Sequence, residues 1–144
     1  MTDTNPKDVL GCQRPPLSTI PANVLLEVGA AMLEGASKYG RHNWRIAGIR
    51  SSIYYDACLR HLFVWWEGED IDTDSGVSHL TKAIAGLVVL RDAQMREKLD
   101  DDRPPTNNRT DFIEQVQEQV TEILAQHPRP KPPYTEESHG DEKE

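Results

Sequence analysis

The sequence predicts an all-α fold, a helical bundle of three core helices with an accessory C-terminal helix. Proline is absent from the 82 residues between Ala22 and Arg103, whereas four prolines precede this stretch and six follow it. An interior proline breaks a helix, so a long proline-free stretch favours helices. Apolar residues within it recur at the spacing of helical faces, and no alternation typical of strands stands out.

The N-terminal part is expected to be an extended arm followed by the first helix. Residues 1–20 hold three prolines, and the Asn5-Pro6 pair is typical of a turn. Pro21 suits the first position of a helix, and the apolar spacing that follows predicts a helix over 21–38. Gly40 is the expected stop. Within this helix, Glu34 and Lys38 are four residues apart, which favours an ion pair.

Two further core helices follow, each bounded by a loop. Residues 39–51 read as a loop, with Ser51 or Ser52 as a cap for a helix over 52–67. That helix is apolar over much of its circumference, so a central position is expected. A short acidic loop at 69–76 leads to a third helix over 77–98.

The chain is expected to divide into four parts. After the arm at 1–20 come a catalytic helical domain at 21–98, a linker with an accessory helix at 99–127, and a disordered polar tail at 128–144. The accessory helix, over 110–126, has one apolar stripe, and its other faces are rich in Glu and Gln. It is therefore expected to pack on another subunit or back on the body.

Composition excludes several classes of protein. No apolar run is long enough for a membrane helix, and the N-terminus has no basic-then-apolar signal pattern, so a cytoplasmic protein without membrane contact is expected. The two cysteines, Cys12 and Cys58, are too few for a disulfide framework, and they lack the CxxC spacing of zinc ligands. The net charge of −8 opposes broad binding to nucleic acid.

Charges are segregated along the chain. From Gly35 to Tyr55 there is no acidic residue, whereas this window holds four basic ones interleaved with aromatic and amide groups. Five of the eight residues from Glu67 to Asp74 are acidic. A basic, aromatic loop suits a phosphorylated ligand with a ring, and a carboxylate cluster suits Mg²⁺ or Mn²⁺. A nucleoside triphosphate with its metal ion needs both kinds of loop. Either loop alone is more often a solvated surface loop without a ligand.

Single residues carry competing interpretations. Glu27 lies on the first helix without a basic partner at i+4, which makes it a metal candidate. Arg60 has a sufficient structural explanation in a pair with Asp56. His61 on an apolar face is more often a satisfied core histidine than a ligand. His79 suits a phosphate contact, but an exposed histidine in a first helical turn is equally ordinary.

Longer strings resemble a known family. The segments RPPLSTIP, EGASKYGRHNWR and LRHLFVWWEGEDIDTDSGVSHL, within about residues 11–92, resemble the phage dATP/dGTP diphosphohydrolases called MazZ. These are related to the all-α MazG-like nucleotide pyrophosphohydrolases and accompany 2-aminoadenine genomes. The resemblance implies metal-dependent hydrolysis of dGTP and dATP to the monophosphate and pyrophosphate, which would support 2-aminoadenine DNA synthesis and deplete dATP.

The resemblance also implies a set of site residues. The paired ExxE and ExxD motifs typical of MazG-like enzymes are absent, so the metal shell is expected to use Glu27, the acidic loop, and His61 or His79. Lys82 stands where related sequences are expected to have a second histidine. The residues that match the family pattern and are expected at the site are Arg14, Glu27, Lys38, Tyr39, Asn43, Trp44, Arg45, Arg60, His61, Glu69, Asp70, Asp72 and His79.

The expected mechanism assigns a role to each group. One or two ions (Mg²⁺, Mn²⁺ or Co²⁺) would be bound by carboxylates and would activate water, with a spare carboxylate or His61 taking the proton. Cationic side chains would neutralise the pyrophosphate, Trp44 or Tyr39 would stack on the purine, and Asn43 would read the base edge or the sugar. The ligands expected are Glu27, Glu69, Asp70 and Asp72; the cationic groups are Lys38, Arg45 and Arg60.

Two other functions stay open from sequence. One is an acidic phage protein that binds and inhibits a host protein, and the other is a nucleotide sensor that binds without turnover. A three-helix core of this length is too small to enclose a triphosphate alone, so a homo-dimer or homo-tetramer is expected, located in the host cytoplasm if phage-encoded.

Overall fold

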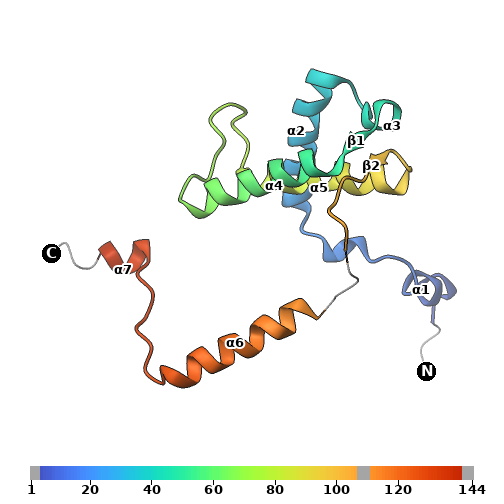
Figure 1. Ribbon diagram of the computed structural model, residues 1–144. Coiled ribbons are helices and arrows are strands. Elements are labelled where there is room, and N and C mark those ends of the chain that lie inside the picture. The colour runs from blue at the N-terminus through green and yellow to red at the C-terminus, as the bar shows by residue number, and fades with distance from the viewer. Residues whose placement is uncertain (1–3, 107–110, 141–144) are drawn as a thin grey trace. The chain divides into compact units, whose positions relative to one another are not determined.

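The computed structural model describes residues 4–106 and 111–140, and it divides the chain into two units, Met1–Arg103 and Pro104–Glu144 (Figure 1). Three long helices make up the first unit: α2 (Ala22–Tyr39), α4 (Ser51–Trp66) and α5 (His79–Met95). The prediction of an all-α fold with three core helices is therefore confirmed. No helix among the described residues is both long and apolar enough to cross a membrane.

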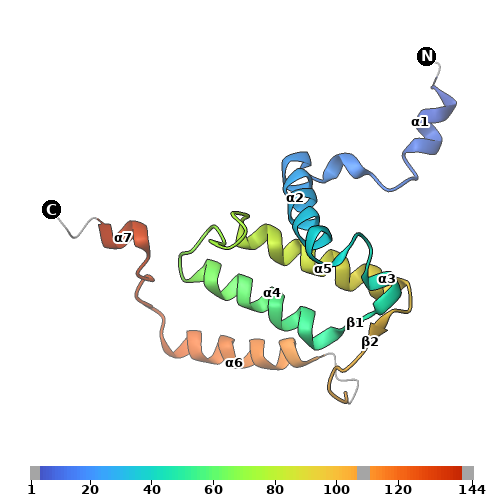
Figure 2. The same ribbon diagram turned by 90° about the horizontal axis from the view of Figure 1, so that it is seen from above.

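Helices α4 and α5 lie side by side and run in opposite directions, and α2 crosses α5 (Figure 2). The tight approach of α4 to α5 depends on Gly86, since a Cβ atom there would lie 2.8 Å from the Sγ atom of Cys58. The core between the helices is made largely of small residues, among them Ala31, Ala85 and the fully buried Ala93. Small residues let helix backbones approach closely, and they leave room beside them for polar groups.

Two-residue strands close one end of this unit. Strand β1 (Ile49–Arg50) enters α4 and pairs in parallel with β2 (Leu99–Asp100), which follows α5. These strands were not predicted because two residues are too few to show the alternation of a strand. The predicted loop at 39–51 also contains a short helix, α3 (Trp44–Ala47).

The predicted helix ends need correction at several points. The third helix begins at His79 and ends at Met95, not at 77 and 98, since Glu97 adopts a positive φ of 56° and turns the chain into β2. Gly40 ends α2 with a φ of 88°, as predicted. Neither serine caps α4 through its side chain. The carboxylate of Asp102 accepts hydrogen bonds from the backbone N–H and the hydroxyl of Ser52.

The arm is not wholly extended, which corrects the sequence prediction. Its helix α1 (Pro6–Gly11) begins after Asn5, whose side chain accepts a hydrogen bond from the N–H of Lys7 at 3.0 Å. An asparagine cap and a proline at the first position also start a helix, so the pair interpreted as a turn begins one. A 3-10 turn, η1 (Leu17–Thr19), follows.

The second unit contains the amphipathic helix α6 (Phe112–Gln126) and the short helix α7 (Glu136–Gly140). Helix α6 matches the predicted accessory helix, and its apolar stripe is exposed. Helix α7 lies within the segment expected to be a disordered tail, so that segment has regular structure at 136–140. Residues 107–110 of the predicted linker and accessory helix, and residues 141–144 of the predicted tail, lie outside the described part of the chain.

Candidate functional site

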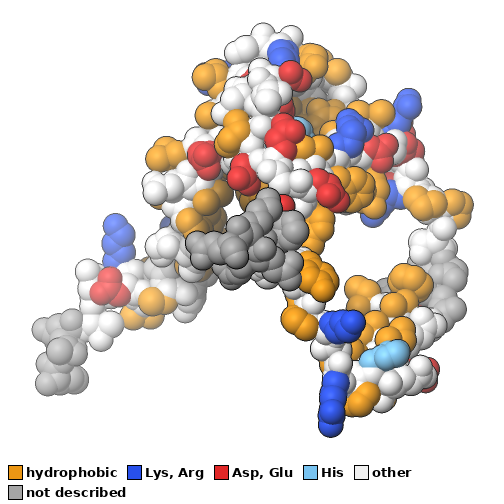
Figure 3. Space-filling model, turned by 90° about the vertical axis from the view of Figure 1, so that its left-hand side faces the viewer, with side chains coloured by type: hydrophobic (Ala, Val, Ile, Leu, Met, Phe, Trp, Pro, Cys, Tyr) orange, Lys and Arg blue, Asp and Glu red, His pale blue; other side chains and the backbone are white. Residues whose placement is uncertain are grey.

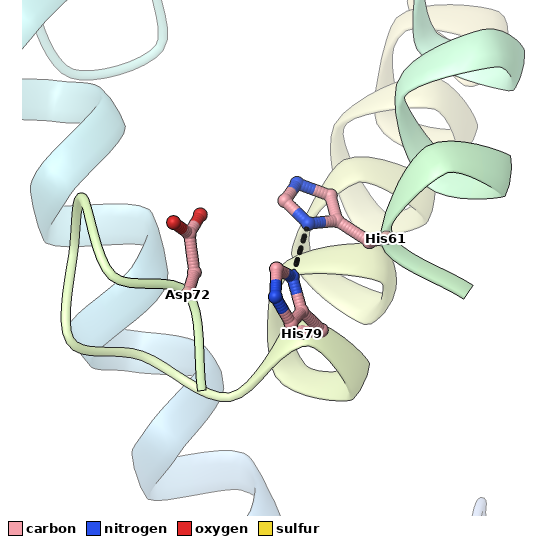
Figure 4. A group of neighbouring side chains, drawn as sticks. All are labelled: His61, Asp72 and His79. Atoms are coloured by element: carbon pink, nitrogen blue, oxygen red, sulfur yellow. Dashed lines mark hydrogen bonds between the residues drawn. The ribbon is translucent and has the colours of Figure 1, made fainter. Parts of the chain in front are cut away.

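Two histidines and an aspartate converge between α4, α5 and the acidic loop. His61 comes from α4, His79 from the first turn of α5, and Asp72 from the loop that joins these helices (Figure 4). One ligand atom from each lies within 4.8 Å of the other two. Two imidazole nitrogens and a carboxylate oxygen at this separation form a donor set suited to a divalent transition-metal ion. We call these three residues the His–Asp–His cluster.

A small hairpin in the acidic loop presents Asp72 to the histidines. Ile71 and Ser78 form an antiparallel bridge, and the N–H of Asp72 donates to the carbonyl of Val77 at 2.9 Å. Gly76, with a φ of 72°, makes the turn that closes the hairpin. Five of the eight residues from Glu67 to Asp74 carry a carboxylate, and the hairpin directs the carboxylate of Asp72 to the cluster.

Hydrogen bonds set the orientation of the histidine rings. The Nδ1 atoms of His61 and His79 are 2.9 Å apart, and Nε2 of His79 lies 3.2 Å from Oε1 of Glu69. An ionised carboxylate only accepts hydrogen bonds, so in this contact the Nε2–H group of His79 donates a hydrogen bond to Glu69. The Nδ1 atom of a neutral His79 then keeps its lone pair, which faces His61. Glu69 thus orients the ring of His79. It contacts the cluster through His79 and is not itself one of the three residues.

The surroundings of His61 favour its uncharged form. Burial lowers the pKa of His61 below its usual value, and the nearby Lys82 and His79 add to this shift. An uncharged imidazole retains a lone pair for a metal ion or a proton. His61 is not a lone histidine, because its Nδ1 atom lies 2.9 Å from Nδ1 of His79.

A line of alternating charges runs beside the cluster. Nζ of Lys82 lies 2.9 Å from Oδ2 of Asp72 and 3.3 Å from Oε2 of Glu34, and Nζ of Lys38 lies 2.7 Å from Oε1 of Glu34. The predicted Glu34–Lys38 pair is confirmed. The hydrogen bond from Lys82 holds the pKa of Asp72 at about 2, with help from the N–H of Asp74. Asp72 is therefore an anion at any physiological pH.

This line of charges borders a pocket of about 340 Å³ between α2, α4 and α5. Its floor is apolar, with Ala57, Ala85 and Val89. Polar groups around it include two lysines, two tyrosines and an amide, which suit a ligand with both anionic and aromatic parts. They are Glu34, Lys38, Tyr39, Asn43, Tyr54, His61 and Lys82.

The basic loop is fixed to α5 by Asp92. Its carboxylate accepts from the indole N–H of Trp44 at 2.7 Å and from Nε and Nη2 of Arg45 at 2.8 and 3.0 Å. These bonds hold the pKa of Asp92 at about 2, chiefly through Arg45 and next through Trp44. Trp44 is buried and lines the pocket, whereas the guanidinium of Arg45 is engaged with Asp92.

Replacing Asp92 by asparagine is expected to change how stability depends on acid. The folded-state pKa of Asp92, about 2, is lower than that of an unfolded aspartate, about 3.9. Ionised Asp92 therefore stabilises the fold above about pH 4, and this stabilisation is lost as pH falls towards 2. Thermal unfolding of Asp92→Asn should show a lower midpoint at pH 7 and a smaller loss across this window. As the control, Asp56→Asn at an exposed position should keep the wild-type dependence of the unfolding midpoint on pH. The same dependence in Asp92→Asn and Asp56→Asn would contradict the role of Asp92.

Several predicted site residues lie outside the cluster. Glu27, on α2, accepts a hydrogen bond of 3.4 Å from the hydroxyl of Thr81. Asp70 is exposed, and its backbone carbonyl accepts from the N–H of His79 at 3.0 Å. Arg60 is exposed on α4, and Arg14 follows α1 in the exposed arm. Of the four predicted metal ligands, only Asp72 belongs to the His–Asp–His cluster.

Three residues at this site were not predicted to act there: Glu34, Lys82 and Asp92. A sequence signal existed for Lys82, which lies one helical turn after His79 and therefore shares its face. No local signal marks Asp92, because its partners are 47 and 48 residues away. The sequence explains Glu34 by its ion pair with Lys38. Its second partner, Lys82, lies on α5 and could not be predicted without the crossing of α2 and α5.

Comparisons with known proteins identify a family. Residues 4–103 match the family described as "dATP/dGTP diphosphohydrolase, N-terminal". A protein of Salmonella phage PMBT28 named dATP/dGTP diphosphohydrolase is 33% identical over 75 residues, which is 52% of this chain and 25% of the phage protein. The chain thus matches about a quarter of the length of that relative. No solved structure matches the chain significantly.

Proposed function

The chain belongs to the dATP/dGTP diphosphohydrolase N-terminal family, and from this membership we propose that it hydrolyses dGTP and dATP to the monophosphate and pyrophosphate. The observation that carries the proposal is the His–Asp–His cluster beside a pocket lined by Lys38 and Lys82. A metal-ligand set next to two ammonium groups suits a nucleotide whose phosphates lie between them.

A divalent metal ion fits the residues present. The donor set is two imidazole nitrogens and one ionised carboxylate, with Glu69 holding the ring of His79 from behind. Mn²⁺ and Co²⁺ accept such mixed nitrogen and oxygen ligands, and Mg²⁺ prefers oxygen alone. We therefore favour Mn²⁺ or Co²⁺ among the three predicted ions. A bound ion would supply Lewis-acid polarisation of a phosphate oxygen and a more acidic water.

The chain's own side chains bind and orient the nucleotide. Lys38 and Lys82 neutralise charge on the leaving pyrophosphate. Tyr39 is 71% exposed and borders the pocket, so it is better placed than the buried Trp44 to stack on a purine. Asn43 faces the base or the sugar from the same pocket. A spare carboxylate or His61 stays the predicted acceptor of the water proton, and Asp70, Arg14, Arg60 and Glu27 stay predicted site residues.

Exposed apolar side chains support a homo-oligomer. Leu26 on α2 is 73% exposed, and Phe63 and Trp66 on α4 are 63% and 78% exposed. Figure 3 shows hydrophobic side chains spread over one face of the molecule with acidic side chains among them. A contact with a second copy of the chain would remove these large apolar side chains from water. We propose that a homo-dimer or homo-tetramer covers these residues.

A nucleotide panel with product analysis tests the function. We expect dGTP and dATP with Mn²⁺ or Co²⁺ to yield pyrophosphate and the monophosphate in equal amounts, and EDTA to stop the reaction. Binding without product would favour the nucleotide sensor, and neither binding nor product would favour the host inhibitor. A role in 2-aminoadenine DNA synthesis and a location in the host cytoplasm stay predictions of the resemblance.

A further inference from the structure

Lys82 is a half-buried cation held between two carboxylates of different elements. Its side chain is 19% exposed, and Nζ contacts Asp72 of the loop at 2.9 Å and Glu34 of α2 at 3.3 Å. The two carboxylates lie on different elements, so an ammonium at this position forms an ion pair with each of them. The side chain therefore carries a fixed positive charge at the edge of the pocket.

The position that Lys82 occupies is one that suits a divalent ion. Two carboxylate oxygens from facing elements converge on Nζ, and one of these carboxylates, Asp72, also belongs to the His–Asp–His cluster. A carboxylate shared between two cations is the arrangement that brings two metal ions together in two-metal sites. Here the second cation is an ammonium supplied by the chain.

We propose that the Lys82 ammonium takes the place of a second divalent ion, so that this site binds one metal ion per chain. This inference rests on the proposed function, because it takes the His–Asp–His cluster to be the metal site. Lys82 contacts both Glu34 and Asp72 and occupies the position between them, so a second ion cannot bind there. It also leaves a fixed donor facing the pocket, where phosphate oxygens of the substrate would lie.

Removing the ammonium should uncover a second ion site. We expect the wild-type chain to bind about one Mn²⁺ in equilibrium dialysis, with an electron paramagnetic resonance spectrum free of coupling between ions. Lys82→Met keeps the length and helix preference of the side chain without its charge. It should bind about two, with the second ion spin-coupled to the first through Asp72. Lys82→Gln should do the same if the Met variant folds poorly.

Two control variants separate this role from a general change of charge. Lys38→Met removes the other ammonium on Glu34, but Lys38 is 56% exposed and contacts neither Asp72 nor a histidine of the cluster, so the count should stay at about one. Glu34→Gln added to Lys82→Met removes one carboxylate of the uncovered pair and should return the count to one.

The outcomes are distinct. Two ions in the wild type, or one ion in both folded Lys82 variants, would overturn this inference while leaving nucleotide hydrolysis intact. No Mn²⁺ in the wild type would overturn the metal cluster and this inference together. Failure of the proposed function shows separately, as absence of pyrophosphate from wild-type protein that has bound its ion.

Discussion

Replacing His79 by alanine is expected to lower hydrolysis of dGTP by at least about 10³-fold, which corresponds to about 4 kcal/mol in the barrier. His79 is buried and contacts His61 through Nδ1 and Glu69 through Nε2. Its loss removes one of the three ligand atoms and leaves the other imidazole without its neighbour. Among the described residues, the cluster keeps only the imidazole of His61 after this change, so the lost ligand atom has no substitute within it.

Pyrophosphate release at saturating dGTP and Mn²⁺ measures this effect. Circular dichroism and thermal unfolding establish that the variant is folded, and His79→Asn, which is smaller than histidine but polar, serves where alanine does not fold. His127→Ala, at the end of α6, removes a histidine from the other unit of the chain and should keep wild-type activity. Activity of folded His79 variants within about threefold of wild type would contradict the role of the cluster.

Replacing Glu69 by glutamine is expected to weaken Mn²⁺ binding by about 10- to 100-fold, the usual effect of losing a carboxylate behind a ligating histidine. Glutamine keeps an oxygen that can accept from Nε2 of His79, but it removes the charge that fixes the ring. The effect should therefore be on metal affinity, and high Mn²⁺ should restore most of the activity.

Isothermal titration with Mn²⁺ and activity at limiting and saturating Mn²⁺ measure the two parts of this effect. The matched control is Glu67→Gln, an exposed carboxylate two residues earlier in the chain, which should bind Mn²⁺ as the wild type does. Equal losses in both variants would mean that the loop acts only through its net charge. A loss in Glu69→Gln that no Mn²⁺ concentration restores would instead give Glu69 a role in the chemical step.

The helices could be predicted from the sequence because the signals that define them are local. Proline-free stretches, apolar spacing and Gly40 gave α2, α4 and α5 to within a few residues. The strands β1 and β2 could not be predicted, since each is two residues long and their pairing joins residues 50 apart. The arm shows a local ambiguity, because Asn5-Pro6 starts either a turn or a helix.

The candidate site was predictable in composition and not in geometry. The basic and acidic segments were visible as runs of charge. Lys38 of the basic segment lines the pocket, whereas Asp72 of the acidic segment reaches its edge through Lys82. Which carboxylate faces the histidines depends on the hairpin closed by Gly76, and the sequence treats Asp70 and Asp72 alike. Arg45 was predicted to bind phosphate. Its partner Asp92 could not be foreseen, because it lies 47 residues later in the sequence, on another helix.

The position of a bound metal ion tests the central claim most directly. Crystals grown with Mn²⁺, measured at its absorption edge, give an anomalous difference map that locates the ion without assumptions about its ligands. We predict one peak per chain, in contact with His61, Asp72 and His79. A peak held by Glu27 and Asp70, with none at the two histidines, would contradict this account and favour the ligand set expected from the sequence.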